Sequence, residues 1–444
     1  MESSFINKYD VIVLGGGPAG YRAALDLDKV GKTVLLIEEK NVGGTCLHRG
    51  CIPTKSLLNS VKNSNAAFNL PEIAHKKMKD INQLYRGLSF RIQHSGVTLL
   101  TGRGKIKNAV DICVTVGENE YYANNLIIAT GSSSSKLEIE GLKEAFAAGK
   151  VVYSDEFLNF EDYPENIIVV GGGVIGIEFA SYLSKLGKNV KILEYRDNIL
   201  CDVLDDDVRD IFVNELKKRG ISIETGIEIQ EIDGSDIIYK KNAIYEECSA
   251  ELIIFAVGRK PNTDDIGVEE CGIDMWKDCI VVDEFCRTCQ PNVYACGDVI
   301  GKSMLAHTAY REAEVAVSNI CGIKAEMNYD AIPSAIYSDP EVAVVGMTEN
   351  NCKQRNILYY VKKASMLYSS RYLIEHGDCP GICKLVFRKT GELIGAQMVG
   401  NGSSEIVFTL ADMIFNKLTE KDIREKIYPH PSTIEIIKEV ISGQ

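Results

Sequence analysis

The sequence predicts an α/β chain with two nucleotide-binding βαβ units and a third domain of α+β type. Residues 9–38 and 166–194 each read as an apolar run, a glycine cluster, a helical stretch and a second apolar run ending in Glu. From about residue 329 the pattern changes to strand candidates followed by helical stretches, which predicts the third domain. The length agrees with several domains, because 444 residues are more than a single hydrophobic core usually organises.

The composition narrows the class of protein without naming a function. A formal net charge of -13 disfavours nucleic acid or an anionic membrane as a partner, since such surfaces are met by clustered Lys and Arg. Residues 1–10 have no export signal, and apolar runs such as 252–257 are strand-length, so we expect a soluble cytoplasmic protein. Fourteen cysteines in such a chain are expected to be mostly buried thiols.

The first βαβ unit begins with the apolar run Val11–Leu14, which is typical of a parallel strand covered on both faces. A helix should follow and end near Gly31. Gly15 is expected to make the tight turn, Gly17 to let backbone approach a pyrophosphate, and Gly20 to let helix pack on strand. Free N–H groups at the start of a helix favour binding of the phosphate groups of a nucleotide. The nucleotide-binding residues predicted at this turn are Gly15, Gly17, Pro18, Ala19 and Gly20.

The second unit repeats this layout after the apolar run 167–170, with a helix expected to end at Gly187. A lone GxGxxG pattern also occurs in plain turns, so the prediction depends on the strand before it, the helix after it and the repetition. The nucleotide-binding residues predicted here are Gly171, Gly173, Ile175 and Gly176.

An acidic residue follows each glycine cluster at the same interval, Glu38 after Gly20 and Glu194 after Gly176. The spacing is close to the roughly 20 residues expected for a carboxylate that binds ribose hydroxyls. A carboxylate repels a 2′-phosphate, so Glu194 favours NAD over NADP. Arg196, two residues further on, leaves some NADP use open.

Two cysteines five residues apart, Cys46 and Cys51, follow the first unit. A regular helix would place their Cα atoms on the order of 8.6 Å apart, beyond the roughly 7 Å limit for a disulfide. A bridge therefore needs an irregular turn, which Gly43, Gly44 and Gly50 permit. In a reducing compartment such a bond is more plausibly catalytic than structural, with a metal site or inert thiols as alternatives.

The run from Gly43 to Lys55 resembles the active-site signature of the glutathione reductase and dihydrolipoamide dehydrogenase family, and the two glycine clusters flank it as in that family. The resemblance implies a redox-active disulfide in which Cys46 meets the substrate and Cys51 faces the flavin of FAD. It also implies that Lys55 lies near the flavin and pairs with Glu178. The FAD-binding residues implied in this run are Gly44, Thr45 and Lys55. His48 and Arg49 depart from the family's usual pair and could tune the thiols.

The resemblance extends to the domain order and to later motifs. Either strand-end turn, at 129–131 or 256–262, could alone be an ordinary turn, but in the family the chain crosses between domains there. Asp298 is expected to accept hydrogen bonds from the ribityl chain of FAD, while Ala313 departs from the family's Gly. The implied domains are 1–144 (FAD, first part, with the redox disulfide), 145–262 (NAD), 263–328 (FAD, second part) and 329–444 (dimerisation). The further cofactor-binding residues implied are Thr130, Gly131, Ser132, Gly258, Gly297, Asp298, Leu305, Ala306 and His307.

Near the C-terminus, His430 lies between two prolines and Glu435 follows five residues later. The pattern alone fits a capped helix start with an incidental histidine. By resemblance it is the family's catalytic base with its orienting carboxylate, which reaches the flavin of the other subunit in a homodimer with a cis bond at His430-Pro431. Cys286 and Cys289 have zinc-like spacing, but no second pair completes a site, so no metal is expected.

The function implied is oxidation of protein-bound dihydrolipoamide with reduction of NAD⁺. The partner expected is the lipoyl-bearing acyltransferase or carrier protein of a 2-oxo acid dehydrogenase, glycine cleavage or acetoin cleavage complex. Reductases that carry a second redox pair are disfavoured because residues 441–444 hold none, and a transhydrogenase is disfavoured by Cys46. Another NAD(P)H-dependent disulfide reductase and a non-catalytic redox sensor that binds FAD and NAD stay open.

Overall fold

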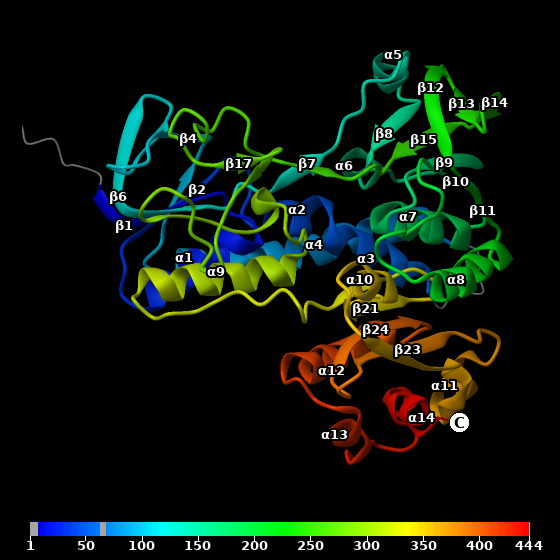
Figure 1. Ribbon diagram of the computed structural model, residues 1–444. Helices are drawn as coiled ribbons and strands as arrows, with labels where there is room; N and C mark the ends of the chain where they lie inside the picture. Colours follow the sequence, from blue (N-terminus) through cyan, green and yellow to red (C-terminus); the bar gives the residue numbers. More distant parts are fainter. Residues whose placement is uncertain (1–7, 63–67, 444) are drawn as a thin grey trace, which may run out of the picture. The chain divides into compact units, whose positions relative to one another are not determined.

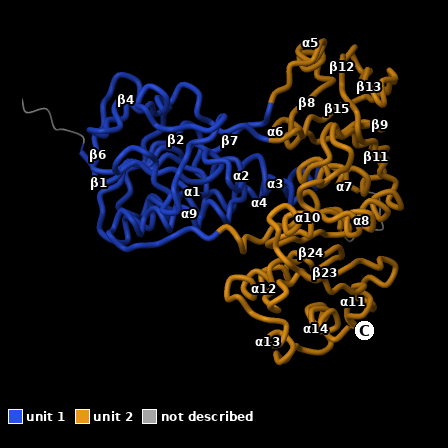
Figure 2. The backbone as a smooth tube through the Cα atoms, viewed as in Figure 1, with its two compact units in different colours: residues 1–56, 71–135, 259–328 blue, residues 57–70, 136–258, 329–444 orange. Residues whose placement is uncertain are grey.

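The computed structural model describes residues 8–62 and 68–443. Over these residues the chain forms two compact units, each built from three separate segments (Figure 2). Unit 1 takes its described residues from 1–56, 71–135 and 259–328, and unit 2 takes its described residues from 57–70, 136–258 and 329–444.

The main sheet of unit 1 has the strand order β3-β2-β1-β6-β5-β4, and β19 also pairs with β6. Strands β1, β2, β3, β6 and β19 run parallel, while β4 and β5 extend the sheet in antiparallel fashion. The continuous apolar run predicted for β1 is buried along its whole length, as a strand covered on both faces requires. The strands are β1 (Lys8–Leu14), β2 (Val34–Glu38), β3 (Thr98–Thr101), β4 (Gly104–Asn108), β5 (Cys113–Val116), β6 (Asn119–Ile128) and β19 (Val293–Ala295).

Helices α1 and α9 lie side by side in unit 1 (Figure 1), joined by an ion pair of 2.8 Å between Arg22 and Glu314. Ala313, which replaces the family's Gly, is fully buried in the core cluster beneath them, so its methyl group is accommodated. The bounds are α1 (Pro18–Lys29), α2 (Gly44–Arg49), α3 (Cys51–Val61), α4 (Leu70–Gln93), β17 (Met275–Trp276), β18 (Cys279–Ile280), η1 (Asp298–Ile300) and α9 (Ala306–Ile320).

A two-stranded ribbon, β7 (Ser132–Ser134) with β16 (Arg259–Pro261), lies where the chain leaves unit 1 after residue 135 and returns at residue 259. Thr130 and Asn262 bind each other there, because the Thr130 hydroxyl donates to the Asn262 carbonyl at 2.8 Å and the Asn262 amide donates back at 2.9 Å. The two strand-end turns are thus hydrogen-bonded to each other.

The first sheet of unit 2 is wholly parallel, in the order β11-β10-β9-β15-β8, and a separate antiparallel sheet has the order β12-β13-β14. The strands are β8 (Val151–Tyr153), β9 (Asn166–Val170), β10 (Asn189–Glu194), β11 (Ile221–Thr225), β12 (Ile227–Asp233), β13 (Asp236–Lys241), β14 (Ile244–Ser249) and β15 (Leu252–Phe255). The helices are α5 (Leu142–Ala147), α6 (Ser154–Phe157), α7 (Val174–Lys185) and α8 (Asp206–Lys218).

The predicted α+β domain after residue 329 has an antiparallel sheet in the order β20-β21-β24-β23-β22, with α12 and α14 contributing to one hydrophobic cluster with it (Figure 1). The strands are β20 (Ser334–Ile336), β21 (Val342–Gly346), β22 (Tyr359–Ala364), β23 (Ile382–Arg388) and β24 (Leu393–Val399). The helices are α10 (Glu349–Gln354), η2 (Met366–Tyr368), α11 (Ser370–His376), α12 (Ser403–Phe415), α13 (Glu420–Arg424), η3 (Thr433–Glu435) and α14 (Ile436–Ser442).

Both predicted helix ends are confirmed. Helix α1 ends at Lys29 and α7 at Lys185, and Gly31 (φ 78°) and Gly187 (φ 82°) follow two residues later in the left-handed conformation that glycine adopts without strain. The expectation that most of the fourteen cysteines are buried was wrong, since six are buried, seven are half-buried and Cys289 is exposed. Cys321, for example, is half-buried as the C-terminal cap of α9, where a small side chain is only partly covered.

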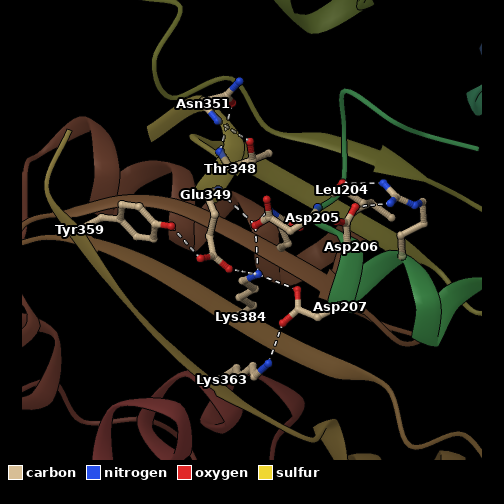
Figure 3. A network of polar contacts seen from close by, with 12 residues as sticks. Leu204, Asp205, Asp206, Asp207, Thr348, Glu349, Asn351, Tyr359, Lys363 and Lys384 are labelled. Atoms are coloured by element: carbon tan, nitrogen blue, oxygen red, sulfur yellow. Dashed lines mark hydrogen bonds and ion pairs between the residues drawn. The ribbon is translucent and has the colours of Figure 1, made fainter. Parts of the chain in front are cut away.

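A buried lysine on β23 in unit 2 joins α8 to the five-stranded antiparallel sheet β20-β21-β24-β23-β22. Lys384 is fully buried, and its ammonium lies 3.1 Å from Asp205, 2.6 Å from Asp207 and 2.6 Å from Glu349. Figure 3 shows all three carboxylates pointing at this one cation. Gln397 donates a further hydrogen bond of 2.7 Å to Asp205. These four partners come from segments far apart in the sequence, so the network ties residues 205–207 to the C-terminal segment of the same unit.

Two absences concern the described residues only. No helix within residues 8–62 and 68–443 is long and apolar enough to cross a membrane. In the same part of the chain no three His, Cys, Asp or Glu side chains gather as a metal site would require, and Cys286 is buried whereas Cys289 is exposed.

Candidate active site

The two glycine turns have the same geometry. Gly15 (φ 104°) and Gly171 (φ 108°) are left-handed, and a Cβ on either would lie within 2.4 Å of a carbonyl oxygen on the neighbouring strand-end turn. A Cβ on Gly20 or Gly176 would lie within 2.0 Å of the carbonyl oxygen of the first glycine. These four positions therefore accept only glycine, as expected for a tight turn and for a helix packed on its strand.

The middle glycine of each cluster faces space instead. A Cβ on Gly17 would meet nothing nearer than the Gly44 Cα at 3.9 Å, and a Cβ on Gly173 would meet nothing within 4 Å. Each lies immediately before a twelve-residue helix, and N–H groups in the first turn of a helix have no partner within that helix. The open side of both turns fits a pyrophosphate held by backbone N–H groups.

The carboxylates of Glu38 and Glu194 have matching partners. One oxygen of Glu38 accepts the Gly16 N–H at 2.7 Å, and one oxygen of Glu194 accepts the Gly172 N–H at 2.6 Å. Each second oxygen accepts a backbone N–H two residues further on at 2.8 Å. Since each carboxylate oxygen has two lone pairs, both acids keep acceptor sites for ribose hydroxyls. The Arg196 guanidinium is paired with Asp202, which favours the NAD prediction over NADP.

The cysteine pair lies at a break between two helices. Helix α2 ends at Arg49, Gly50 adopts φ -150° and ψ -112°, and α3 begins at Cys51. The irregular turn required by the five-residue spacing is therefore present, and Gly43 and Gly44 before it are both left-handed. The side chains of Cys46 and Cys51 are hydrogen-bonded to each other in the structure. The disulfide of the oxidised protein stays a prediction.

The environment of Cys46 favours its protonated form. Its hydrogen bond with Cys51 and its burial raise the pKa of the Cys46 thiol well above the ordinary value, against a smaller lowering effect of Lys55. His48, one of the two departures from the family, points its ring at the Val42 carbonyl at 2.9 Å and packs edge-on against Tyr85. In this arrangement His48 makes its contacts with Val42 and Tyr85.

Asp298 lies at the centre of a polar group next to the cysteine segment. The Ser132 hydroxyl donates to Asp298 at 2.5 Å, and Arg259 donates to the Ser132 hydroxyl at 2.8 Å and to its carbonyl at 2.6 Å. Arg259 also reaches the Thr45 hydroxyl at 3.4 Å. Sequence reasoning missed Arg259 as a site residue, although its place in the turn beside Gly258 was the available signal. Gly297 before Asp298 is left-handed and donates its N–H to the buried carboxylate of Glu312.

The predicted base is present with its carboxylate. Nδ1 of His430 lies 2.8 Å from Glu435 Oε2, and the His430-Pro431 bond is cis as expected. An ionised carboxylate only accepts hydrogen bonds, so in the neutral form of the ring Nδ1 carries the proton and Nε2 has the lone pair. Glu435 is 8% exposed, whereas the His430 side chain is 71% exposed. The buried Glu435 therefore orients the His430 ring through Nδ1, while the ring itself stays exposed to solvent.

The predicted residues divide cleanly between the two units. Glu178 is 3% exposed on α7 and accepts the Tyr337 N–H at 3.0 Å, whereas Lys55, its predicted partner, belongs to unit 1. That pairing stays a prediction. Unit 1 holds Gly15, Gly17, Pro18, Ala19, Gly20, Glu38, Gly44, Thr45, Cys46, Cys51, Lys55, Thr130, Gly131, Ser132, Gly297, Asp298, Leu305, Ala306 and His307. Unit 2 holds Gly171, Gly173, Ile175, Gly176, Glu178, Glu194, Gly258, His430 and Glu435.

Two nucleotide turns and a cysteine pair define an oxidoreductase of the pyridine-nucleotide and disulfide class. A family model described as pyridine nucleotide-disulphide oxidoreductase matches residues 9–313, and one described as the dimerisation domain of that family matches residues 332–441. The chain belongs to the pyridine nucleotide-disulphide oxidoreductase family.

Several curated relatives bear the name dihydrolipoyl dehydrogenase. That of Mycoplasma genitalium is 34% identical over 97% of this chain and 97% of its own length, and that of Geobacillus stearothermophilus is 33% identical over 98% and 96%. Among solved structures, the HOCl-induced flavoprotein disulfide reductase RclA from Escherichia coli matches with a TM-score of 0.88 and 25% identity, over 98% of this chain and 99% of that chain.

Proposed function

We propose that the protein is a dihydrolipoamide dehydrogenase, which oxidises protein-bound dihydrolipoamide to lipoamide and reduces NAD⁺ to NADH. The observation that carries the chemistry is the contact of Cys46 with Cys51 at the break between α2 and α3. The substrate is supported by relatives named dihydrolipoyl dehydrogenase that match over nearly the whole chain.

FAD binds to unit 1 and NAD to the βαβ segment of unit 2. The open space beside Gly17 and Gly173 and the acceptor sites of Glu38 and Glu194 support this assignment. We assign residues 1–144 and 263–328 to FAD binding, 145–262 to NAD binding and 329–444 to dimerisation. Each cofactor-binding residue predicted from the sequence is assigned to FAD or to NAD according to the range in which it lies.

The thiol chemistry starts at His430. Its Nε2 takes the proton from one thiol of dihydrolipoamide, and the resulting thiolate attacks Cys46 of the oxidised pair. Cys51 leaves as a thiolate, at the first position of α3, where free N–H groups stabilise negative charge. The second substrate thiol then attacks the sulfur bonded to Cys46, which releases lipoamide and Cys46. The raised pKa of Cys46 lets it take up the second proton.

FAD, when bound, accepts the electron pair of the reduced cysteines and delivers it as a hydride to NAD⁺. Lys55 is the cation we assign beside it, with Glu178 as the counter-charge that a buried ammonium needs. Arg259, held by Ser132 and near Thr45, keeps Asp298 oriented toward the ribityl side of this site.

The active form is a homodimer in which His430 serves the cysteine pair of the other subunit, an assignment supported by the dimerisation-domain match over residues 332–441. The partner is a lipoyl-bearing acyltransferase or carrier protein of a multienzyme complex. Its identity and a cytoplasmic location are predictions from the sequence.

The test is steady-state turnover of the purified, FAD-loaded protein. Dihydrolipoamide with NAD⁺ should give rapid NADH formation, and replacing NAD⁺ by NADP⁺ should lower the rate strongly. The matched assays use NADH or NADPH with oxidised glutathione. Turnover only with these would favour the alternative of another disulfide reductase, and no turnover with any pair would favour a redox sensor.

A further inference from the structure

Helix α11 and the serine before it lie directly behind the His430–Glu435 pair. We infer that Ser369 is a positioning residue for the catalytic base, acting through the loop that carries His430 and through the start of α11. This inference rests on the proposed role of His430 and adds a residue to it that the sequence motifs did not indicate.

Ser369 uses its hydroxyl group in two directions. The residue is fully buried, its hydroxyl donates to the Ser432 carbonyl at 2.9 Å, and its oxygen accepts the Tyr372 N–H at 3.3 Å. The first contact attaches the loop that contains His430 and Pro431, and the second caps α11. A single buried hydroxyl therefore joins the catalytic loop to the helix.

The next residue holds the carboxylate. The Ser370 N–H donates to Glu435 Oε1 at 3.0 Å, while Oε2 of the same carboxylate binds His430 at 2.8 Å. Rotation of the Glu435 side chain would break one of these two bonds. The direction of the His430 ring is thus set by a backbone N–H whose place depends on the cap at Ser369.

Helix α11 is itself firmly anchored. Tyr372 is fully buried in the core cluster of the α+β domain. A Cβ on Gly400 would lie 2.7 Å from its hydroxyl oxygen, and a Cβ on Gly381 would lie 3.0 Å from it, so both glycines leave room for this ring. The start of α11 is therefore supported by the core, and Ser369 links the loop of the exposed His430 to it.

Removing the hydroxyl should affect one half of the reaction. In Ser369→Ala the Ser432 carbonyl loses a buried partner and α11 loses its cap, so the loop that carries His430 is held less firmly. We expect flavin reduction by dihydrolipoamide to slow roughly threefold to tenfold, since about 1.4 kcal/mol corresponds to tenfold. The fall should appear in kcat, with KM for dihydrolipoamide nearly unchanged, and hydride exchange between NADH and the flavin should keep its rate.

A matched control exists in the same domain. Ser365 caps η2 by accepting the Leu367 N–H at 3.3 Å and donates to the Pro380 carbonyl at 2.7 Å, but it touches neither His430 nor Glu435 in the contacts of the described chain. Ser365→Ala should leave both half-reactions within twofold of the wild type. If Ser369→Ala does not fold, Ser369→Cys keeps the volume with a weaker donor and should show the same selective loss.

The outcomes separate this inference from the proposed function. His430→Gln is assayed in parallel, and its failure to slow flavin reduction by dihydrolipoamide would overturn the proposed function itself. If His430→Gln is slow but the Ser369 variants keep the wild-type rate, or lose both half-reactions equally, Ser369 is not a positioning residue. Selective loss in Ser369→Ala with a normal Ser365→Ala supports it.

Discussion

Lys384→Met should destabilise the protein much more than an average core substitution. The variant keeps a side chain of similar length but leaves three carboxylates without their shared cation, of which Asp205 is only 5% exposed. Removing one partner of a buried ion pair costs about 3–5 kcal/mol. Asp207 and Glu349 are 35% and 27% exposed and can be partly hydrated, so we expect a loss near the lower end, about 3 kcal/mol.

The measurement is thermal unfolding of the FAD-loaded protein followed by far-UV circular dichroism. At about 2–4 °C per kcal/mol for a unit of this size, the variant should unfold roughly 6–12 °C below the wild type. Lys363→Met is the matched control, because Lys363 pairs with Asp207 from an exposed position and its loss should cost about 1 kcal/mol or less.

The effect should also depend on pH. Burial alone would raise the pKa of Asp207 and of Glu349. Hydrogen bonds from Lys363 and Lys384 hold the pKa of Asp207 below its usual value, and hydrogen bonds from Lys384 and Tyr359 do the same for Glu349. Carboxyls with a lowered folded pKa contribute stability above their unfolded pKa, and this is lost as pH falls through the folded pKa. Without Lys384 the carboxylates protonate more easily, so the gap between variant and wild type should shrink between neutral pH and about pH 4. A gap below about 1 kcal/mol at neutral pH, or one independent of pH, would refute the reasoning.

Three further predictions concern the reaction. Cys51→Ser should abolish the long-wavelength absorbance that appears on reduction when a thiolate lies against the flavin, while Cys46→Ser keeps it; the reverse result would exchange the two roles. His430→Gln should slow flavin reduction by dihydrolipoamide by roughly 10²–10⁴ with NADH exchange nearly normal, measured by stopped flow; equal loss of both would make His430 structural. Glu194→Ala should raise KM for NAD⁺ roughly tenfold to hundredfold, since hydrogen bonds to a charged group are worth about 1.5–3 kcal/mol, and an unchanged KM would remove Glu194 from the nucleotide site.

Local patterns predicted much of the fold and site. The glycine clusters, the ends of α1 and α7 and the pairing of His430 with Glu435 involve residues close in sequence, where backbone geometry and spacing decide the outcome. The break at Gly50 could be inferred as well, because two cysteines five residues apart cannot approach each other on a regular helix.

Contacts between distant segments could not be predicted from local sequence patterns. Lys384 is an ordinary lysine in an apolar strand until residues 205–207 and 349 are brought to it, and no periodicity predicts that meeting. Ser369 lies 63 residues before the carbonyl it binds. Arg259 reaches Thr45 across more than two hundred residues of sequence. For such groups the tertiary fold supplies the partner that makes a polar side chain functional.

The ribbon of β7 and β16 brings the two ends of the segment 136–258 close together. Ser134 and Arg259 are direct strand partners, so the segment 136–258 leaves and re-enters unit 1 at neighbouring points. Domains are most readily exchanged where their two ends lie close together. The segment 136–258 thus has the layout of an insertion in a single loop of unit 1. A short turn in its place should leave the main sheet of unit 1 with all of its strands, β1 to β6 and β19.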